Sequence, residues 1–449
     1  MIAGRRAESW SRPRVLRPAR PAAPTKIASR QSEAGGRELA GRAAGWIDRQ
    51  YDATRSAFRF SPESAPSLVG SACAALAAET LGALGAWSAK RRRAVAQGIR
   101  RFQRPDGWFE DPLLVPRAGA DLDAHYLRGH ATFLALMSLD ALGEQAVFPL
   151  EFLDRWRDDD TVNDWIDKLD WTNPWRESNW VEWIGYWLLR DAGFTVADVP
   201  LSRVRWPRGF AGLFAWLRDH QDPTTGMWGT PPRPEPQRTL HLMAGAYHHY
   251  VFYYATGTPV PHLEAIVDHC LALQQADGLF LPGVSGGGPC EDLDAIDILA
   301  NMHRLGDYRR TDIEQALERA LGGLCDNPRS DGAFVNRHDP IGSRGRTGWL
   351  AEAFSPRASR LRTRAGALKR ALLLDQRGPC IGYAGSRTLP FHRAGGDMFS
   401  QWFRPLAIAL AATVLGPDGS PVWWGFGFRD RITQGWWAGD RSPAAEGNA

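Results

Sequence analysis

Four carboxylates crowd the start of one predicted helix, and they are the first candidates for chemistry in this chain. Glu291, Asp292, Asp294 and Asp297 follow directly after a glycine-rich loop at residues 286–288. Glu291, Asp294 and Asp297 are spaced three residues apart, so a helix places them on one face. Like charges this close are unfavourable unless one carboxyl is protonated, is paired with a cation, or binds a metal ion. The spacing therefore predicts a site.

A short turn recurs along the chain and divides it into helix pairs. The first copy, Gln103 to Trp108, reads Gln-Arg-Pro-Asp-Gly-Trp. Related turns carry glycine at positions 226, 278 and 332, each with an aromatic residue within the next two positions. Aspartate followed by glycine is typical of a tight turn that needs a positive φ. The repeat predicts one supersecondary unit used several times.

Helical patterns of two kinds alternate around these turns. An amphipathic segment precedes each turn and a more apolar segment follows it. Amphipathic helices belong on the outside of a fold and apolar ones inside. We therefore predict an all-α (α/α)6 toroid, formed as a single domain by residues 37–449. The predicted inner helices are residues 67–84, 125–142, 180–189, 241–254, 291–305 and 401–415. The predicted outer helices are residues 38–51, 93–102, 152–165, 210–220, 262–274 and 312–324.

Three stretches do not follow this pattern. Residues 1–36 are rich in arginine, alanine and proline, and we expect a disordered basic tail. Residues 325–400 fit the period poorly and are predicted to be an irregular insertion. The insertion contains a basic segment at 357–370, which is either a solvated helix face or a patch for an anionic substrate. Short strands or extended loops are expected only at 388–391 and 422–428.

Composition narrows the classes of function. The chain of 449 residues has 20 tryptophans, which favours an aromatic-lined interior or a large core. A net charge of +4 over this length does not indicate a nucleic-acid partner. Five scattered cysteines without a close pair argue against a disulfide framework, so we expect a cytoplasmic protein. We find no apolar run long enough for a transmembrane helix, while peripheral membrane contact and the oligomeric state stay open.

The turns of the form Gln-x-x-Asp-Gly-aromatic resemble those of the terpenoid cyclase and protein prenyltransferase superfamily of toroids, which includes squalene cyclases. The resemblance covers about residues 40–340. It implies an active site near one end of the inner helices. It says little about the substrate, because one fold supports many functions.

The resemblance implies an acid for the first hypothesis, a protonation-initiated cyclisation of an isoprenoid. Class II cyclases carry Asp-x-Asp-Asp on an inner helix and use the middle aspartate to protonate an alkene or epoxide. The sequence Asp-Leu-Asp-Ala at 292–295 is similar, so Asp294 would be the acid and Asp292 its partner. Ala295 replaces the last aspartate, and Glu291 or Asp297 could supply the missing charge. Such an enzyme would be a terpene cyclase-like isomerase or lyase.

Aromatic faces would stabilise the carbocation that such a reaction forms. They should come from residues near the starts of the inner helices. The candidates are Trp175, Trp180, Trp183 and Tyr250.

A second hypothesis is an enzyme that acts on an acidic polysaccharide as a lyase, hydrolase or epimerase. Tryptophan faces stack on sugar rings, while histidine, asparagine and arginine bind uronates or move protons. Residues of these types gather near the same helix starts. They are Arg128, His130, Trp175, Asn179, His248 and His249.

Two further alternatives concern metals and pure binding. Protein prenyltransferases hold zinc through an aspartate and a cysteine that follows it, but here Cys290 precedes Asp292, so the order is wrong. A divalent ion bridging Asp292 and Asp294 suits carboxylate oxygens better. We nevertheless expect no cofactor. A non-catalytic toroid that binds an isoprenoid, an oligosaccharide or another partner is the last alternative, in which the carboxylates only cap and solvate a helix start.

Overall fold

The computed structural model describes residues 33–116, 122–194, 206–337, 354, 380–386 and 388–416. These residues are mostly helical, which confirms the predicted all-α class. The basic segment at 357–370 and the expected strand at 422–428 lie outside the described residues, as does the predicted tail up to residue 32. The first described helix begins at Glu33.

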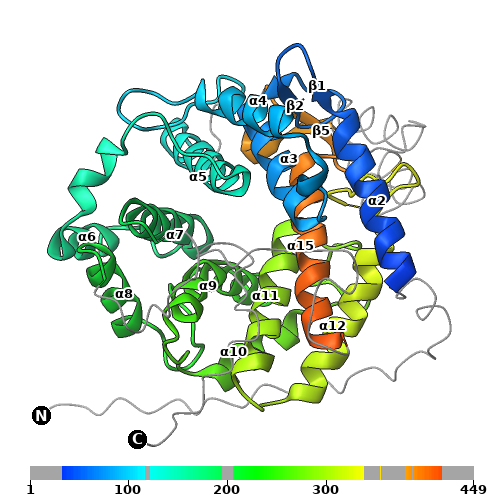
Figure 1. Cartoon of the computed structure of the whole chain (residues 1–449). Helices are drawn as coiled ribbons and strands as arrows, with labels where there is room; N and C mark the ends of the chain where they lie inside the picture. Colours follow the sequence, from blue (N-terminus) through cyan, green and yellow to red (C-terminus); the bar gives the residue numbers. More distant parts are fainter. Residues whose placement is uncertain are drawn as a thin grey trace, which may run out of the picture.

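Six apolar helices lie around a common centre (Figure 1), and each of them falls on a predicted inner segment. They contact one another in chain order, and the last of them, α15, also contacts the first, α3. Most of their residues are buried, as their composition requires. They are α3 (Leu68–Thr80), α5 (Ala124–Leu142), α7 (Pro174–Asp191), α9 (Gln237–Thr256), α11 (Pro289–Leu305) and α15 (Met398–Leu415).

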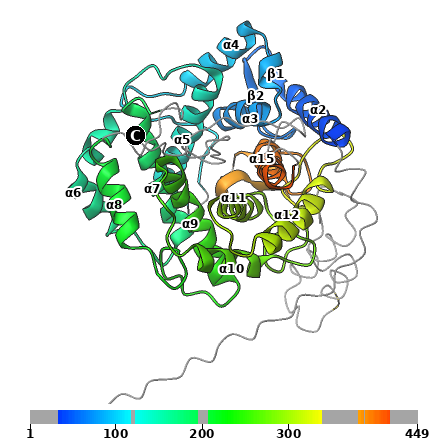
Figure 2. The same cartoon turned by 60° about the horizontal axis from the view of Figure 1, so that its bottom comes forward.

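Amphipathic helices cover this ring from outside, as Figures 1 and 2 show. In α12 the buried residues Ile313, Leu317, Ala320 and Leu324 recur at helical spacing and face α11 and α15. The outer helices are α2 (Glu33–Arg49), α4 (Ala89–Arg100), α6 (Asp159–Ile166), α8 (Phe210–Asp219), α10 (Leu263–Leu273) and α12 (Arg310–Cys325).

One predicted outer helix, at residues 152–165, is interrupted. A 3-10 helix, η2 (Glu151–Trp156), comes first, and α6 starts only at Asp159. The side chain of Asp158 accepts the backbone N–H of Thr161, so it caps a new helix rather than continuing the old one.

The recurring turns are braced by glutamine. Gln103 Nε2 donates to the carbonyl of Gly107 (3.3 Å), and Gln274 Nε2 donates to that of Gly278 (2.8 Å). The turn at Gly332 has no glutamine at the matching position. Gln401 of α15 takes this role by donating to the Gly332 carbonyl (3.2 Å). Gln221 Nε2 also donates to the carbonyl of Gly226 (2.6 Å), so a contact that is local in three repeats is long-range at Gly332.

Two small antiparallel sheets fill irregular parts of the chain. The first, β1 (Tyr51–Asp52), β2 (Ala57–Arg59) and β3 (Pro66–Ser67), was not predicted from the sequence. The second pairs β4 (Cys380–Gly382) with β5 (Pro390–His392), and β5 overlaps the expected extended segment at 388–391. Two short 3-10 helices, η1 (Leu84–Ala86) and η4 (Tyr383–Gly385), complete the described elements.

By length and composition α15 alone among the described helices could cross a membrane, yet 83% of it is buried inside the protein. It contacts α3, α11 and α12, and it carries the fully buried Arg404. It is therefore a core helix of this fold.

Gly278→Ala should destabilise the protein clearly more than Gly143→Ala. Both glycines have a positive φ, which costs an alanine about 1 kcal/mol. A Cβ at Gly278 would also collide with the carbonyl oxygen of Arg319, whereas a Cβ at Gly143 would have nothing within 4 Å. We expect Gly278→Ala to lose roughly twice as much free energy of unfolding in urea titrations. Equal losses would show that the turn does not need this close approach.

Candidate acid site

The four predicted carboxylates lie together at the start of α11. Asp292, Asp294 and Asp297 have exposed fractions of 0%, 1% and 3%, and Glu291 is partly buried. The glycine-rich loop closes tightly over them, because a Cβ at Gly287 would collide with Asp292 Oδ2. Helices α9 and α15 flank α11, so the cluster faces the interior and not solvent. We call these four residues the acid cluster.

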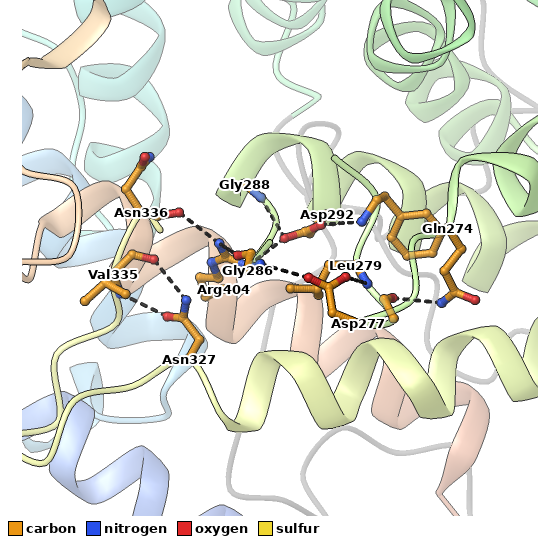
Figure 3. A network of polar contacts seen from close by, with 12 residues as sticks. Gln274, Asp277, Leu279, Gly286, Gly288, Asp292, Asn327, Val335, Asn336 and Arg404 are labelled. Atoms are coloured by element: carbon orange, nitrogen blue, oxygen red, sulfur yellow. Dashed lines mark hydrogen bonds and ion pairs between the residues drawn. The ribbon is translucent and has the colours of Figure 1, made fainter. Parts of the chain in front are cut away.

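Asp292 is fully engaged in hydrogen bonds (Figure 3). Its Oδ1 accepts the N–H of Phe280 (2.8 Å), and its Oδ2 accepts the N–H of Gly288 (3.0 Å). Arg404 Nη1 donates to the same Oδ2 at 2.6 Å. Burial raises the pKa of Asp292, and Arg404 and the Phe280 N–H oppose that rise. With three donors bound, this carboxylate is a structural acceptor.

The position of Asp292 has counterparts in other repeats. Ser71 of α3 accepts the N–H of Phe58 (2.9 Å), and Gln401 of α15 accepts that of Phe334 (2.8 Å). In each case a side chain in the first turn of an inner helix holds the aromatic residue that precedes the helix. Asp292 makes the same contact with a carboxylate, and the negative charge of that carboxylate is paired with the guanidinium of Arg404.

Asp294 is in the opposite situation. Its Oδ2 is buried and has no hydrogen-bond partner among the described residues. Burial first, and then the carboxylates of Glu291 and Asp297, raise its pKa well above the ordinary value for aspartate. Glu182 of α7 acts in the same direction. Each of these influences favours the protonated carboxyl over the carboxylate.

Asp297 and Glu291 are intermediate between Asp292, which accepts three hydrogen bonds, and Asp294, whose Oδ2 accepts none. Asp297 Oδ1 accepts from Asn301 Nδ2 at 3.2 Å, and burial raises its pKa to about 8. Burial also raises the pKa of Glu291, while the nearby arginines, Arg337 first, oppose the rise. Neither group supplies a positive charge that would oppose the rise in the pKa of Asp294.

Aromatic rings from α5, α7 and the short helix η4 form a continuous arc of contacts. Trp183 contacts Trp180 and Tyr126, with ring centroids 5.0 Å apart in both pairs. His130 lies 5.8 Å from Trp183 and shares a 2.7 Å hydrogen bond with the hydroxyl of Tyr383. We call these five residues the aromatic arc.

The arc reaches α11. Burial raises the pKa of Tyr126 and of Tyr383, and the Cys290 thiol beside Asp292 contributes to both shifts. Burial lowers the pKa of His130 to about 4, so this ring is neutral. Tyr126 and Tyr383 are therefore near enough to Cys290, in the first turn of α11, to interact with it electrostatically.

Tyr383 was missed in the sequence because it lies in the segment that fits the repeat period poorly. It joins the site through Phe60, at a centroid distance of 4.5 Å, and through Phe399 of α15, at 5.4 Å. No local pattern around residue 383 points to this role.

Three of the predicted binding residues lie at the rim of the ring. Arg128 stacks over Trp108 (4.7 Å) and lines a pocket of ≈ 700 Å³ between α4 and the start of α5. Trp175 packs edge-on against His241, with centroids 5.5 Å apart. Asn179 Nδ2 donates to the Trp175 carbonyl at 2.7 Å.

The predicted residues of α9 lie inside the protein. His248 Nδ1 is 2.9 Å from Ser178 Oγ, and burial lowers the pKa of this histidine to about 3. His249 is fully buried against Trp228, with centroids 4.8 Å apart. The Tyr250 hydroxyl donates to the Gly226 carbonyl (2.6 Å), so it braces a repeat turn.

The donor set at Cys290 and Asp292 does not favour a metal. Among the described residues no group of three or more histidine, cysteine, aspartate or glutamate side chains is arranged to hold one. Burial raises the pKa of Cys290 well above the usual thiol range, so it is not the thiolate that binds metal. The Asp292 oxygens already accept three hydrogen bonds.

Comparison with known proteins gives similarity in structure only. No family model matches the chain, and no curated protein is significantly similar to it. It is similar to a variant of the type II terpene cyclase MstE from Scytonema in complex with its substrate, geranylgeranyl dihydroxybenzoate. Identity is 11%, the TM-score is 0.47, and the match covers 85% of this chain and 99% of that one.

Two further structures are similar at the same level. The apo form of MstE matches with 12% identity and a TM-score of 0.40, covering 67% of this chain and 82% of that one. A protein from Actinoplanes matches with 16% identity and a TM-score of 0.43, covering 85% of this chain and all of that one. At such low identity these likenesses assign no residue a role.

Asp292→Asn and Asp294→Asn should affect stability very differently. Asp292→Asn leaves the buried Arg404 charge without its partner, which costs about 3–5 kcal/mol. Asp294→Asn removes no hydrogen bond at Oδ2 and replaces a neutral carboxyl by a neutral amide, so we expect a change below about 1 kcal/mol. Urea unfolding at pH 7 measures both. Similar losses in the two variants would contradict this division of roles.

Stability should fall as the pH rises from about 4 to about 8. Folding raises the pKa of Asp297 from 3.8 to about 8, so within this window the folded state binds a proton that the unfolded state has lost. One such group removes about 1.4 kcal/mol of stability per pH unit. Asp297→Asn should flatten this slope in unfolding curves recorded at several pH values. An unchanged slope would show that Asp297 is ionised in the folded protein.

Proposed function

We propose that the chain is a closed (α/α)6 toroid and a terpene cyclase-like isomerase or lyase that cyclises an isoprenoid by protonation. One observation carries this proposal. Asp294 is buried, its Oδ2 has no partner among the described residues, and burial together with the nearby carboxyl groups raises its pKa well above the ordinary value. An uncharged substrate such as an alkene can then accept this proton from Asp294.

The chemistry follows from a carboxyl that holds its proton in a dry setting. Asp294 transfers its proton to one carbon of an alkene, and the neighbouring carbon becomes a carbocation. The π electrons of the next double bond attack that carbon and close a ring, so the charge moves along the chain. Loss of a proton from the last cation restores charge balance. Asp294 is left as a carboxylate beside the Asp292–Arg404 pair.

The aromatic arc suits the cationic stage. Each tryptophan or tyrosine face contributes about 0.5–2 kcal/mol to a cation placed over it. Trp183 is fully buried and Trp180 and Tyr126 nearly so, which also keeps water from quenching the cation. His130 is neutral and therefore does not repel the charge.

The alternatives have less support. A polysaccharide needs an open groove, whereas His248, His249 and Tyr250 are buried among their own protein contacts. A toroid that only binds a partner gains nothing from an unpaired buried carboxyl, which is rare in folded proteins. The five described cysteines are free thiols, and we propose a reducing, cytoplasmic setting on that ground.

Asp294→Asn should abolish turnover of an isoprenoid by about 10²–10⁴-fold, the usual contribution of a general acid. Geranylgeranyl dihydroxybenzoate, the substrate bound by the Scytonema enzyme, is a suitable probe, and mass spectrometry with chromatography separates cyclised products. Asp268→Asn changes an exposed carboxyl on α10 that is paired with Arg309, and as the control it should keep full activity. Full activity in a folded Asp294→Asn variant would exclude Asp294 as the acid.

A further inference from the structure

Two arginines lie side by side next to the start of α11. The N–H of Arg337 donates to the carbonyl of Arg393 at 2.8 Å, within a short ladder in which Val335 bridges Gly396. Arg404 holds this ladder in place because its Nη2 donates to Asn336 and to Gly286, at 3.0 Å each. The same guanidinium therefore joins the ladder to the glycine-rich loop (Figure 3).

The side chains of Arg337 and Arg393 each have a buried Nε without a hydrogen-bond partner among the described residues. Neither guanidinium has an ion pair with another described residue. Arg404 Nε, in a side chain with no exposure, also lacks a partner. Buried donors are almost always bonded in folded proteins, so three of them in one place need an explanation.

The charges nearby do not balance. Arg404 is matched by Asp292 at 2.6 Å. Both Arg337 and Arg393 lower the pKa of Glu291, yet among the described residues neither arginine forms an ion pair with it. Burial lowers the pKa of Arg393, and the charge of Arg337 lowers it further. The two positively charged guanidinium groups repel each other, and one carboxyl does not neutralise both. A bound anion would balance the remaining charge.

We propose that Arg337 and Arg393 form an anion-binding site for a carboxylate or phosphate group carried by the substrate. Paired guanidinium groups bind such oxyanions with charge-assisted, often bidentate, hydrogen bonds. The first residue they face, Glu291, precedes Asp294 by three positions on α11, which is about 4.5 Å along the helix axis. This proposal rests on the proposed function, because it makes the substrate an isoprenoid with an acidic group.

Binding of inorganic diphosphate tests the site without any turnover. Isothermal titration calorimetry on the full chain should give a Kd that rises about tenfold or more in Arg337→Ala and in Arg393→Ala. Arg310→Ala removes the same charge from an exposed pair on α12 and should leave the Kd unchanged. Arg393→Gln serves if the alanine variant melts early. Equal affinity in all these proteins, or no binding to the wild type, would overturn the proposal.

Measurements of turnover distinguish an anionic group of the substrate from a free anion bound at the same arginines. Arg393→Ala should raise KM for geranylgeranyl dihydroxybenzoate and leave KM for the neutral geranylgeraniol unchanged. Diphosphate should compete with the first substrate. Diphosphate binding that depends on both arginines without competition would assign the site to a free ion and refute the substrate assignment. An active Asp294→Asn variant that still shows the arginine-dependent KM would refute the acid and leave the anion site standing.

Discussion

The buried ion pair between Arg404 and Asp292 is the contact on which the rest of the site depends. Neither side chain has any exposure, so their charges are satisfied only by each other and by backbone groups. Arg404 reaches α11, the glycine-rich loop and the segment at Asn336 from a single point on α15. Loss of this pair would release the loop and the helix start that carry Asp294.

The Arg404–Asp292 ion pair also gives Asp292 a different role from Asp294. Asp292 binds Arg404 and two backbone N–H groups, and therefore takes the role that Ser71 and Gln401 take in other repeats. Asp294 Oδ2 has no such donor among the described residues, and burial and the nearby carboxyl groups raise its pKa. One helix start thus holds two carboxyl groups two residues apart, and their surroundings alone distinguish them.

The site is assembled from elements that are distant in the chain. Trp183 comes from α7, Tyr126 and His130 from α5, and Tyr383 from the loop after β4. Contacts between successive inner helices bring these residues together. A scaffold of recurring helix pairs can therefore carry a site that is not repeated.

The sequence by itself determined the alternation of outer and inner helices, the glycine turns and the shared helix face of Glu291, Asp294 and Asp297. These features follow from local periodicity and backbone conformation, which neighbouring residues carry. Only the tertiary structure decided which carboxylate is paired, because Arg404 lies 112 residues from Asp292. It also placed Tyr250 on a turn carbonyl and brought Tyr383 to His130, 253 residues away. Contacts of this kind depend on how helices pack, and packing leaves no pattern in a local stretch of sequence.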